Sequence, residues 1–188
     1  MRPHNHKIWF IVLALGGMAY PALVYVGLPF LPPPLFVIIA LALIALRLVT
    51  VQRRDRNGPW VWPLLIAAVI LIAVAAFDSA IAVKAYPVIL SLTAACVFGI
   101  SLISPPTVVE RLARLTDPDL TPEGVSYTRT VTQVWTVFLL GNAVISAAVG
   151  LWGSIELWTL WNGLLSYLFM GMLFLGEFAV RRFVRKQI

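Results

Sequence analysis

The side chains that could take part in chemistry are few, and the largest group of them lies in the polar stretch from 104 to 130. Three carboxylates fall close together there, at Asp117, Asp119 and Glu123. Neighbouring carboxylates can act as a general acid and a general base, so catalysis would be sought here first. A solvated loop followed by a helix cap explains these residues more simply, because acidic side chains are stabilised in the first turn of a helix. We therefore expect no catalytic residue in this stretch.

The other groups that could bind a metal or act as a nucleophile stand alone. His4 and His6 are the only histidines, and no carboxylate or cysteine lies near them to complete a metal site. Cys96, the single cysteine, has no histidine nearby in the sequence, so we expect a buried packing thiol. The chain contains no HExxH, GxSxG, P-loop or glycine-rich dinucleotide motif. These observations predict a protein that is not an enzyme and that holds no metal or cofactor.

Two pairs of polar residues interrupt apolar stretches. Asn142 and Ser146 are four residues apart, and so are Asn162 and Ser166, which places each pair on one face of a helix. Amides and hydroxyls at such positions can bond across a contact between helices within a membrane. Two interpretations remain open: a tight helical hairpin held by polar contacts, or a polar groove that receives a headgroup or a lipid-like substrate.

The composition predicts that these residues belong to a membrane protein. Of the 188 residues, 61% are hydrophobic and 12% are charged, and soluble domains carry about twice that charged fraction. Six apolar runs approach the ~20 residues that a helix needs to cross a bilayer. We predict an all-α, polytopic transmembrane helix bundle in which residues 1–188 form a single integral membrane domain. Its six spans cover 8–27, 34–51, 60–77, 85–104, 131–152 and 157–180.

The basic residues predict the direction of the spans. If the N-terminus is cytoplasmic, 13 of the 14 Lys and Arg residues fall on the cytoplasmic side, and only Lys84 falls on the other. Cytoplasmic loops of membrane proteins carry this excess of positive charge. We therefore expect both termini and the loop 105–130 in the cytoplasm. Orientation accounts for the net charge of +6, so we expect no nucleic-acid partner.

Residues near the ends of the spans are expected to serve the membrane boundary. Arg47 can extend its guanidinium to the surface, Glu177 can pair with Arg181 one turn later, and Asp78 can pair with Lys84 across a short hairpin. Tryptophans at both boundaries are expected to form aromatic belts. They are Trp9, Trp60, Trp62, Trp135, Trp152, Trp158 and Trp161.

The cytoplasmic loop 105–130 is expected to contain a short helix of its own. Thr107 and Glu110 have the spacing of a capping box, and Thr121 followed by Pro122 predicts the start of a second helix that continues into the span 131–152. The first helix would lie on the membrane with Val108, Val109, Leu112 and Leu115 on its apolar face and its charged residues turned away. The charged side chains of the loop are candidates for docking a partner: Glu110, Arg111, Arg114, Asp117, Asp119 and Glu123.

Three segments carry a resemblance to a known family. They are YPV at 86–88, PPTVVERLARLTDPDLTPEGVSYTRTVTQVW from 105, and WTLWNGLLSYLFMGMLFLGEFAVRR from 158. With these the chain resembles a family of small bacterial membrane proteins associated with fatty-acid-synthase-like genes for aryl polyene lipids. The resemblance implies a multi-pass protein of the inner membrane with a role in envelope lipid synthesis, and it supplies no catalytic residue.

A looser pattern is similar to the intracellular septation protein A family. It consists of a tight hairpin that ends in Lys84, a basic cytoplasmic loop, Trp135 with Phe138, and a second tight turn before Trp158. This similarity implies a role in envelope maintenance.

These observations lead to a functional prediction with alternatives. We predict a non-enzymatic integral protein that contacts the lipid bilayer and docks cytoplasmic or membrane proteins of lipid biosynthesis through the loop 105–130. A small transporter or flippase of lipid-like molecules is the alternative. A membrane acyl or glycosyl transferase is a third possibility, for which Asp117, Asp119 and Glu123 would have to provide the chemistry.

Overall fold

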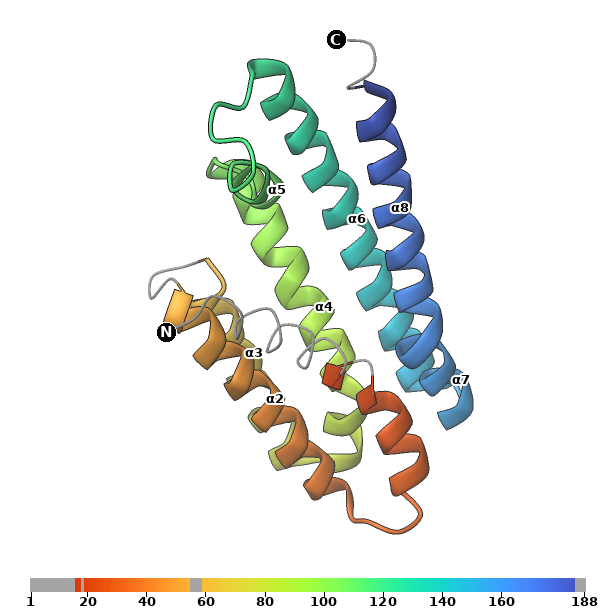
Figure 1. Cartoon of the computed structure of the whole chain (residues 1–188). Coiled ribbons are helices and arrows are strands. Elements are labelled where there is room, and N and C mark those ends of the chain that lie inside the picture. The colour runs from red at the N-terminus through yellow and green to blue at the C-terminus, as the bar shows by residue number, and fades with distance from the viewer. Residues whose placement is uncertain (1–15, 18, 55–58, 185–188) are drawn as a thin grey trace, which may run out of the picture.

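The computed structural model describes residues 16, 17, 19–54 and 59–184, without the side chains of 53, 54 and 181–184. Helices make up the regular secondary structure of this part of the chain, and it contains no strand. A first helix covers 19–27, and the others are α2 (Pro33–Arg54), α3 (Val61–Phe77), α4 (Ser79–Ile103), α5 (Val108–Ala113), α6 (Pro122–Trp152), α7 (Ile155–Leu160), the π-helix η1 (Trp161–Leu165) and α8 (Ser166–Val184). Figure 1 shows them as an elongated bundle.

Four helical segments are long and apolar enough to cross a membrane, which confirms an all-helical protein of membrane type. They are Pro33–Gln52, Ser79–Ile103, Pro122–Trp152 and Ile155–Val180. α3 is equally apolar but has 17 residues, a length of about 25 Å at 1.5 Å per residue. Residues 8–15 and 18 of the span expected at 8–27 lie outside the described residues.

α4 lies at the centre of the bundle. It packs against α6 on one side and against α2 and α3 on the other (Figure 1). The largest buried cluster joins the helix 19–27 to α2, α3 and α4 and includes Tyr20, Phe36 and Tyr86. A second cluster around Trp135 joins α5, α6 and α8.

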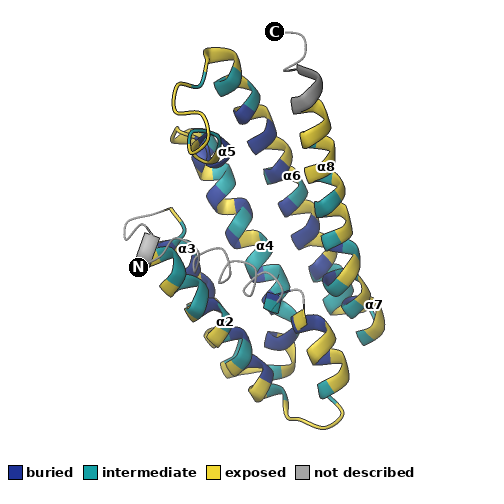
Figure 2. Cartoon of the chain, in the orientation of Figure 1, coloured by how far each residue is buried: buried dark blue, intermediate teal, exposed yellow. Residues whose placement is uncertain are grey.

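The outer surface of the bundle is apolar. Large hydrophobic side chains are exposed along every long helix, and Phe77 is the extreme at 94% exposure. Figure 2 shows these exposed faces alternating with buried ones along the helices. A surface of this kind suits contact with lipid chains, because a soluble monomer rarely exposes apolar patches this large.

One helix start differs from the sequence prediction, and one agrees. The fourth span was expected to begin at 85, but α4 begins at Ser79 because the Asp78 carboxylate caps it, accepting from the N–H groups of Ala80 at 2.7 Å and Ile81 at 3.2 Å. α6 continues as a single helix through the expected span 131–152, as predicted. The expected helix start at Thr121 and Pro122 is confirmed.

Burial contradicts the expected roles of three residues. Trp62 and Trp152 are exposed, as members of an aromatic belt must be, but Trp135 and Trp158 are buried. The indole N–H of Trp158 donates to the carbonyl oxygen of Lys84 at 3.3 Å, so this ring packs between helices. Cys96 was expected to be buried, and it is exposed on α4. Its hydrophobic neighbourhood in the sequence reflects a lipid-facing position and not a core position.

Candidate functional site

The loop 105–130 is held firmly against the bundle at its beginning. Thr107 and Glu110 form the expected capping box: Thr107 Oγ1 accepts from the N–H of Glu110 at 3.2 Å, and Glu110 Oε2 accepts from the N–H of Thr107 at 3.4 Å. The N–H of Val108 donates to Ser101 Oγ on α4 at 3.1 Å. The last of these bonds joins α5 to the end of α4, and Val109 packs against Val131 and Trp135 of α6.

Glu110 does not face away from the bundle as the sequence analysis expected. The residue is only 5% exposed, and its carboxylate also pairs with Arg114 at 2.9 Å. The capping box requires this position, because the side chain must fold back towards Thr107. The prediction that Glu110 is available for docking is therefore wrong, whereas Arg111, Asp117, Asp119 and Glu123 are exposed and Arg114 is half-buried.

The expected apolar face of α5 is divided in two. Val108 and Val109 are buried against the bundle, but Leu112 and Leu115 are exposed by 55% and 66%. Arg111 is exposed beside them, and its Nε donates to the carbonyl oxygen of Pro106 at 2.9 Å. An ordered surface that combines leucines, cations and carboxylates therefore lies over this end of the bundle.

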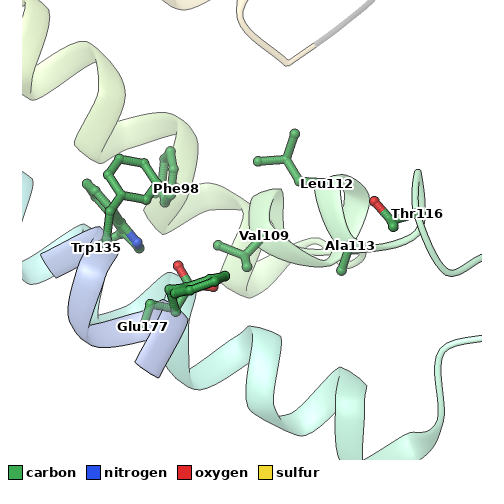
Figure 3. A pocket seen from close by; sticks show the side chains of 9 residues that line it. Phe98, Val109, Leu112, Ala113, Thr116, Trp135 and Glu177 are labelled. Atoms are coloured by element: carbon green, nitrogen blue, oxygen red, sulfur yellow. The ribbon is translucent and has the colours of Figure 1, made fainter. Parts of the chain in front are cut away.

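A pocket of about 360 Å³ opens beneath α5. Figure 3 shows Phe98, Val109 and Trp135 around it, with Leu112 of α5 at its edge. The Trp135 ring is 4.5 Å from the ring of Phe174 and 6.4 Å from that of Phe98. Glu177 is the one carboxylate in the lining. The pocket can hold an apolar or aromatic group, but it lacks a second carboxylate for acid–base chemistry.

Three of the four polar residues expected within the spans take part in two separate sets of hydrogen bonds. The Ser146 hydroxyl donates to Asn162 Oδ1 at 2.6 Å, and Asn162 Nδ2 donates to the Trp158 carbonyl at 3.0 Å. Asn142 Nδ2 donates to Ser91 Oγ on α4 at 2.9 Å, and Asn142 Oδ1 accepts from the Trp161 indole at 3.2 Å. Each amide thus finds a donor and an acceptor inside the protein, which favours the tight-hairpin interpretation over a groove.

Some partners in these two sets of hydrogen bonds could not be found from the sequence. Ser91 and Trp161 were missed because neither belongs to the pairs of polar residues spaced four apart. Ser91 lies on α4, and Trp161 begins η1. Ser166, the fourth expected residue, is buried at the start of α8, one turn after Asn162. The π-helix η1 contains Asn162, so the widened turn lies where the polar contacts are made.

Arg47 does not lie free at the surface of the bundle. A methyl group added at Gly17 would lie 2.5 Å from Arg47 Nη2 and 3.7 Å from the Tyr167 hydroxyl, so both side chains approach the first helix. The nearby Tyr86 hydroxyl is buried and has no hydrogen-bond partner among the described residues. Arg47 therefore turns towards neighbouring helices, in contrast to the expected extension into solvent.

The other expected ion pairs have different outcomes. Asp78 and Lys84 do not pair, because Asp78 caps α4 and Lys84 Nζ donates to the Gly150 carbonyl at 3.4 Å. The pairing of Glu177 with Arg181 cannot be assigned, since the Arg181 side chain lies outside the described residues.

In the part of the chain that the structure describes, no three His, Cys, Asp or Glu side chains lie close enough to hold a metal ion. His4 and His6 lie outside that part. Comparison of the chain with protein-family models, with curated proteins and with solved structures found no match.

Proposed function

We propose that this protein crosses the inner membrane of a bacterium six times, with both termini in the cytoplasm. Four membrane-length helices, the apolar helix α3 and the helix 19–27 support this topology, together with the one-sided distribution of Lys and Arg. A cysteine placed at Gln187 or at Arg54, with Cys96 replaced by serine, tests it. An impermeant maleimide should label both positions only after the inner membrane is opened. Labelling of Gln187 from the periplasm would contradict the topology.

Within this topology, we propose that the protein is a non-enzymatic scaffold that docks partner proteins at its cytoplasmic face. The observation that carries the proposal is that α5 has an ordered backbone and exposed side chains. Its backbone is fixed by the capping box and by Ser101, yet Leu112, Leu115 and Arg111 are exposed. An ordered surface loses little conformational entropy when a partner binds, and exposed leucines beside charges can bury apolar area and select a partner by charge.

The partners we propose are proteins that synthesise an envelope lipid of the aryl polyene type. The resemblance of the polar segment and of the last span to proteins that accompany such genes supports this choice. The apolar pocket beneath α5 supports it as well, because an acyl or aromatic group emerging from a bound enzyme would find a matching surface there.

Crosslinking in living cells tests the scaffold proposal. A photoreactive amino acid at Leu115 should give a protein adduct whose partner, identified by mass spectrometry, acts on lipids. The matched control is Leu151, which is 68% exposed near the opposite end of α6 and should give lipid adducts only. Lipid adducts alone at both positions, or unchanged lipids and pigments in a deletion strain, would count against the proposal.

A transporter of lipid-like molecules is the second candidate. The specific observations in its favour are Pro87 inside α4 and the π-helix η1 in the last span, since irregular helices often mark substrate paths in transporters. Reconstituted vesicles would show movement of a fluorescent lipid between leaflets that exceeds the rate in protein-free vesicles.

A further inference from the structure

A groove runs along α4 at the end of the bundle opposite α5. It has a volume of about 460 Å³ and is bounded by α3, α4 and α6. α4 forms its floor from Ala80 to Ile89, and the last turns of α3 and α6 form its walls. The floor is about 14 Å long at 1.5 Å per residue. Lys84 divides this floor, so that about 8 Å of it, from Lys84 to Ile89, lies beyond the ammonium towards the middle of α4.

The walls of the groove are apolar and open to the surrounding lipid. Ile70 and Val74 come from α3, and Ala147 and Leu151 come from α6. Ile70, Ile81 and Leu151 are exposed, so the groove faces the outside of the bundle rather than its core. Ser146 also borders the groove, but its hydroxyl is already bonded to Asn162. An acyl chain is the group whose shape and polarity match such walls.

One cation lies in the lining of this groove. Lys84 is the only Lys or Arg between residues 59 and 110, and the stretch from 130 to 180 has none. It is the sixth residue of α4, about 8 Å along the axis from Ser79. Asp78 is engaged in capping α4, and no described carboxylate forms an ion pair with Lys84.

The ammonium of Lys84 is held in position with donors to spare. Nζ donates to the Gly150 carbonyl at 3.4 Å, and its stem packs near Trp158, whose indole bonds the Lys84 carbonyl at 3.3 Å. An ammonium has three N–H donors, so two remain for an oxyanion. A charge at membrane depth is costly without such a partner.

We infer that this groove is a binding site for an anionic phospholipid of the adjacent leaflet, with one acyl chain along α4 and the phosphate on Lys84. A second copy of this chain would also cover the apolar walls, but it offers neither an acyl chain nor a phosphate, and the one exposed carboxylate beside this end that is not capping α4 is Glu156 of α7. This site lies at the other end from the α5 surface, so its existence does not depend on the scaffold proposal.

Native mass spectrometry of the full chain in a neutral detergent tests the inference. Phosphatidylglycerol, phosphatidylcholine and a single-chain fatty acid are titrated separately. We expect phosphatidylglycerol to bind about five-fold more tightly than phosphatidylcholine, the effect of about one lysine near a charged lipid. Lys84→Gln should remove this preference and Lys84→Arg should keep it. Arg129→Gln, which removes an exposed charge near the start of α6 at the opposite end, should leave it unchanged.

A second variant and a second measurement guard against misfolding. Ala147→Leu places a larger side chain in the groove wall and should weaken binding of both phospholipids. In the wild-type chain, the preference for phosphatidylglycerol should fade as salt is raised, because the contact is between a cation and a phosphate. Equal affinity for the two phospholipids, a preference that survives Lys84→Gln, or tighter binding of the fatty acid would each overturn the inference.

Discussion

The Tyr20 hydroxyl lies 3.4 Å from the carbonyl oxygen of Val83, the carbonyl that Pro87 leaves without its helical partner. A proline has no N–H to donate four residues back, so a helix interior with a proline loses one hydrogen bond. The single O–H of Tyr20 offers a donor from another helix, shared between the Val83 carbonyl and the Phe36 carbonyl at 3.5 Å. This contact explains how α4 can include a proline at the centre of the bundle without a buried, unpaired carbonyl.

Tyr20→Phe should destabilise the protein by about 1 kcal/mol, because the Val83 carbonyl then loses its donor. Pro87→Ala restores an N–H at position 87, so the same tyrosine substitution in that background should cost much less. Unfolding of the four purified proteins in mixed micelles measures the coupling. Equal costs in both backgrounds would show that Tyr20 does not serve the carbonyl freed by Pro87.

Asn162→Leu should lower stability by roughly 1–2 kcal/mol, because the Ser146 hydroxyl loses its acceptor and the Trp158 carbonyl loses a donor. Thr159→Val is the matched control, since Thr159 Oγ1 is buried with no partner among the described residues and its loss should be neutral or stabilising. Denaturant midpoints of both variants decide the matter. An unchanged midpoint for Asn162→Leu would contradict the tight-hairpin interpretation and favour the polar groove.

Thr107→Ala should release α5 by removing its cap, at a cost of about 1 kcal/mol confined to the loop. The readout is the rate of tryptic cleavage after Arg111 and Arg114, which should rise severalfold while the long helices stay protected. Thr116→Ala, an exposed threonine of the same loop, should leave the rate unchanged. A similar rise in both variants would mean that the cap does not hold the loop.

Cys96→Leu should leave stability nearly unchanged, because Cys96 faces outward from α4. The same substitution one residue earlier, Ala95→Leu, should cost about 1–3 kcal/mol, since Ala95 is buried between helices and a larger side chain cannot fit without displacement. Thermal unfolding in detergent compares the two. A larger loss of stability in Cys96→Leu than in Ala95→Leu would support the expectation that the Cys96 thiol is buried.

Gly153→Ala should destabilise the turn between α6 and α7. An added methyl group there would lie 2.5 Å from the carbonyl oxygen of Val149, a backbone atom that cannot move aside cheaply. Gly171→Ala is the control, because nothing lies within 4 Å of a methyl group at Gly171, and alanine is the better helix former. Helix content and unfolding temperature should fall below the wild-type values in Gly153→Ala and rise above them in Gly171→Ala.

The sequence by itself determined the features that depend on local chemistry. Apolar runs of membrane length predict helices, because a backbone in lipid must satisfy its own hydrogen bonds. The cap residues Thr107 with Glu110, and Thr121 with Pro122, mark helix starts correctly, since a cap involves only atoms three or four residues apart. The polar positions Asn142 and Asn162 could be singled out, because amides are rare in such runs.

Only the tertiary structure decided which face of each helix meets a neighbour. In a membrane protein the lipid side and the core side are both apolar, so hydrophobic periodicity does not separate Cys96 on the outside from Ala95 on the inside. Partners such as Tyr20 and Val83, or Lys84 and Gly150, are 63 and 66 residues apart in the chain. Contacts of this range depend on how whole helices pack, and no local pattern in the sequence records them.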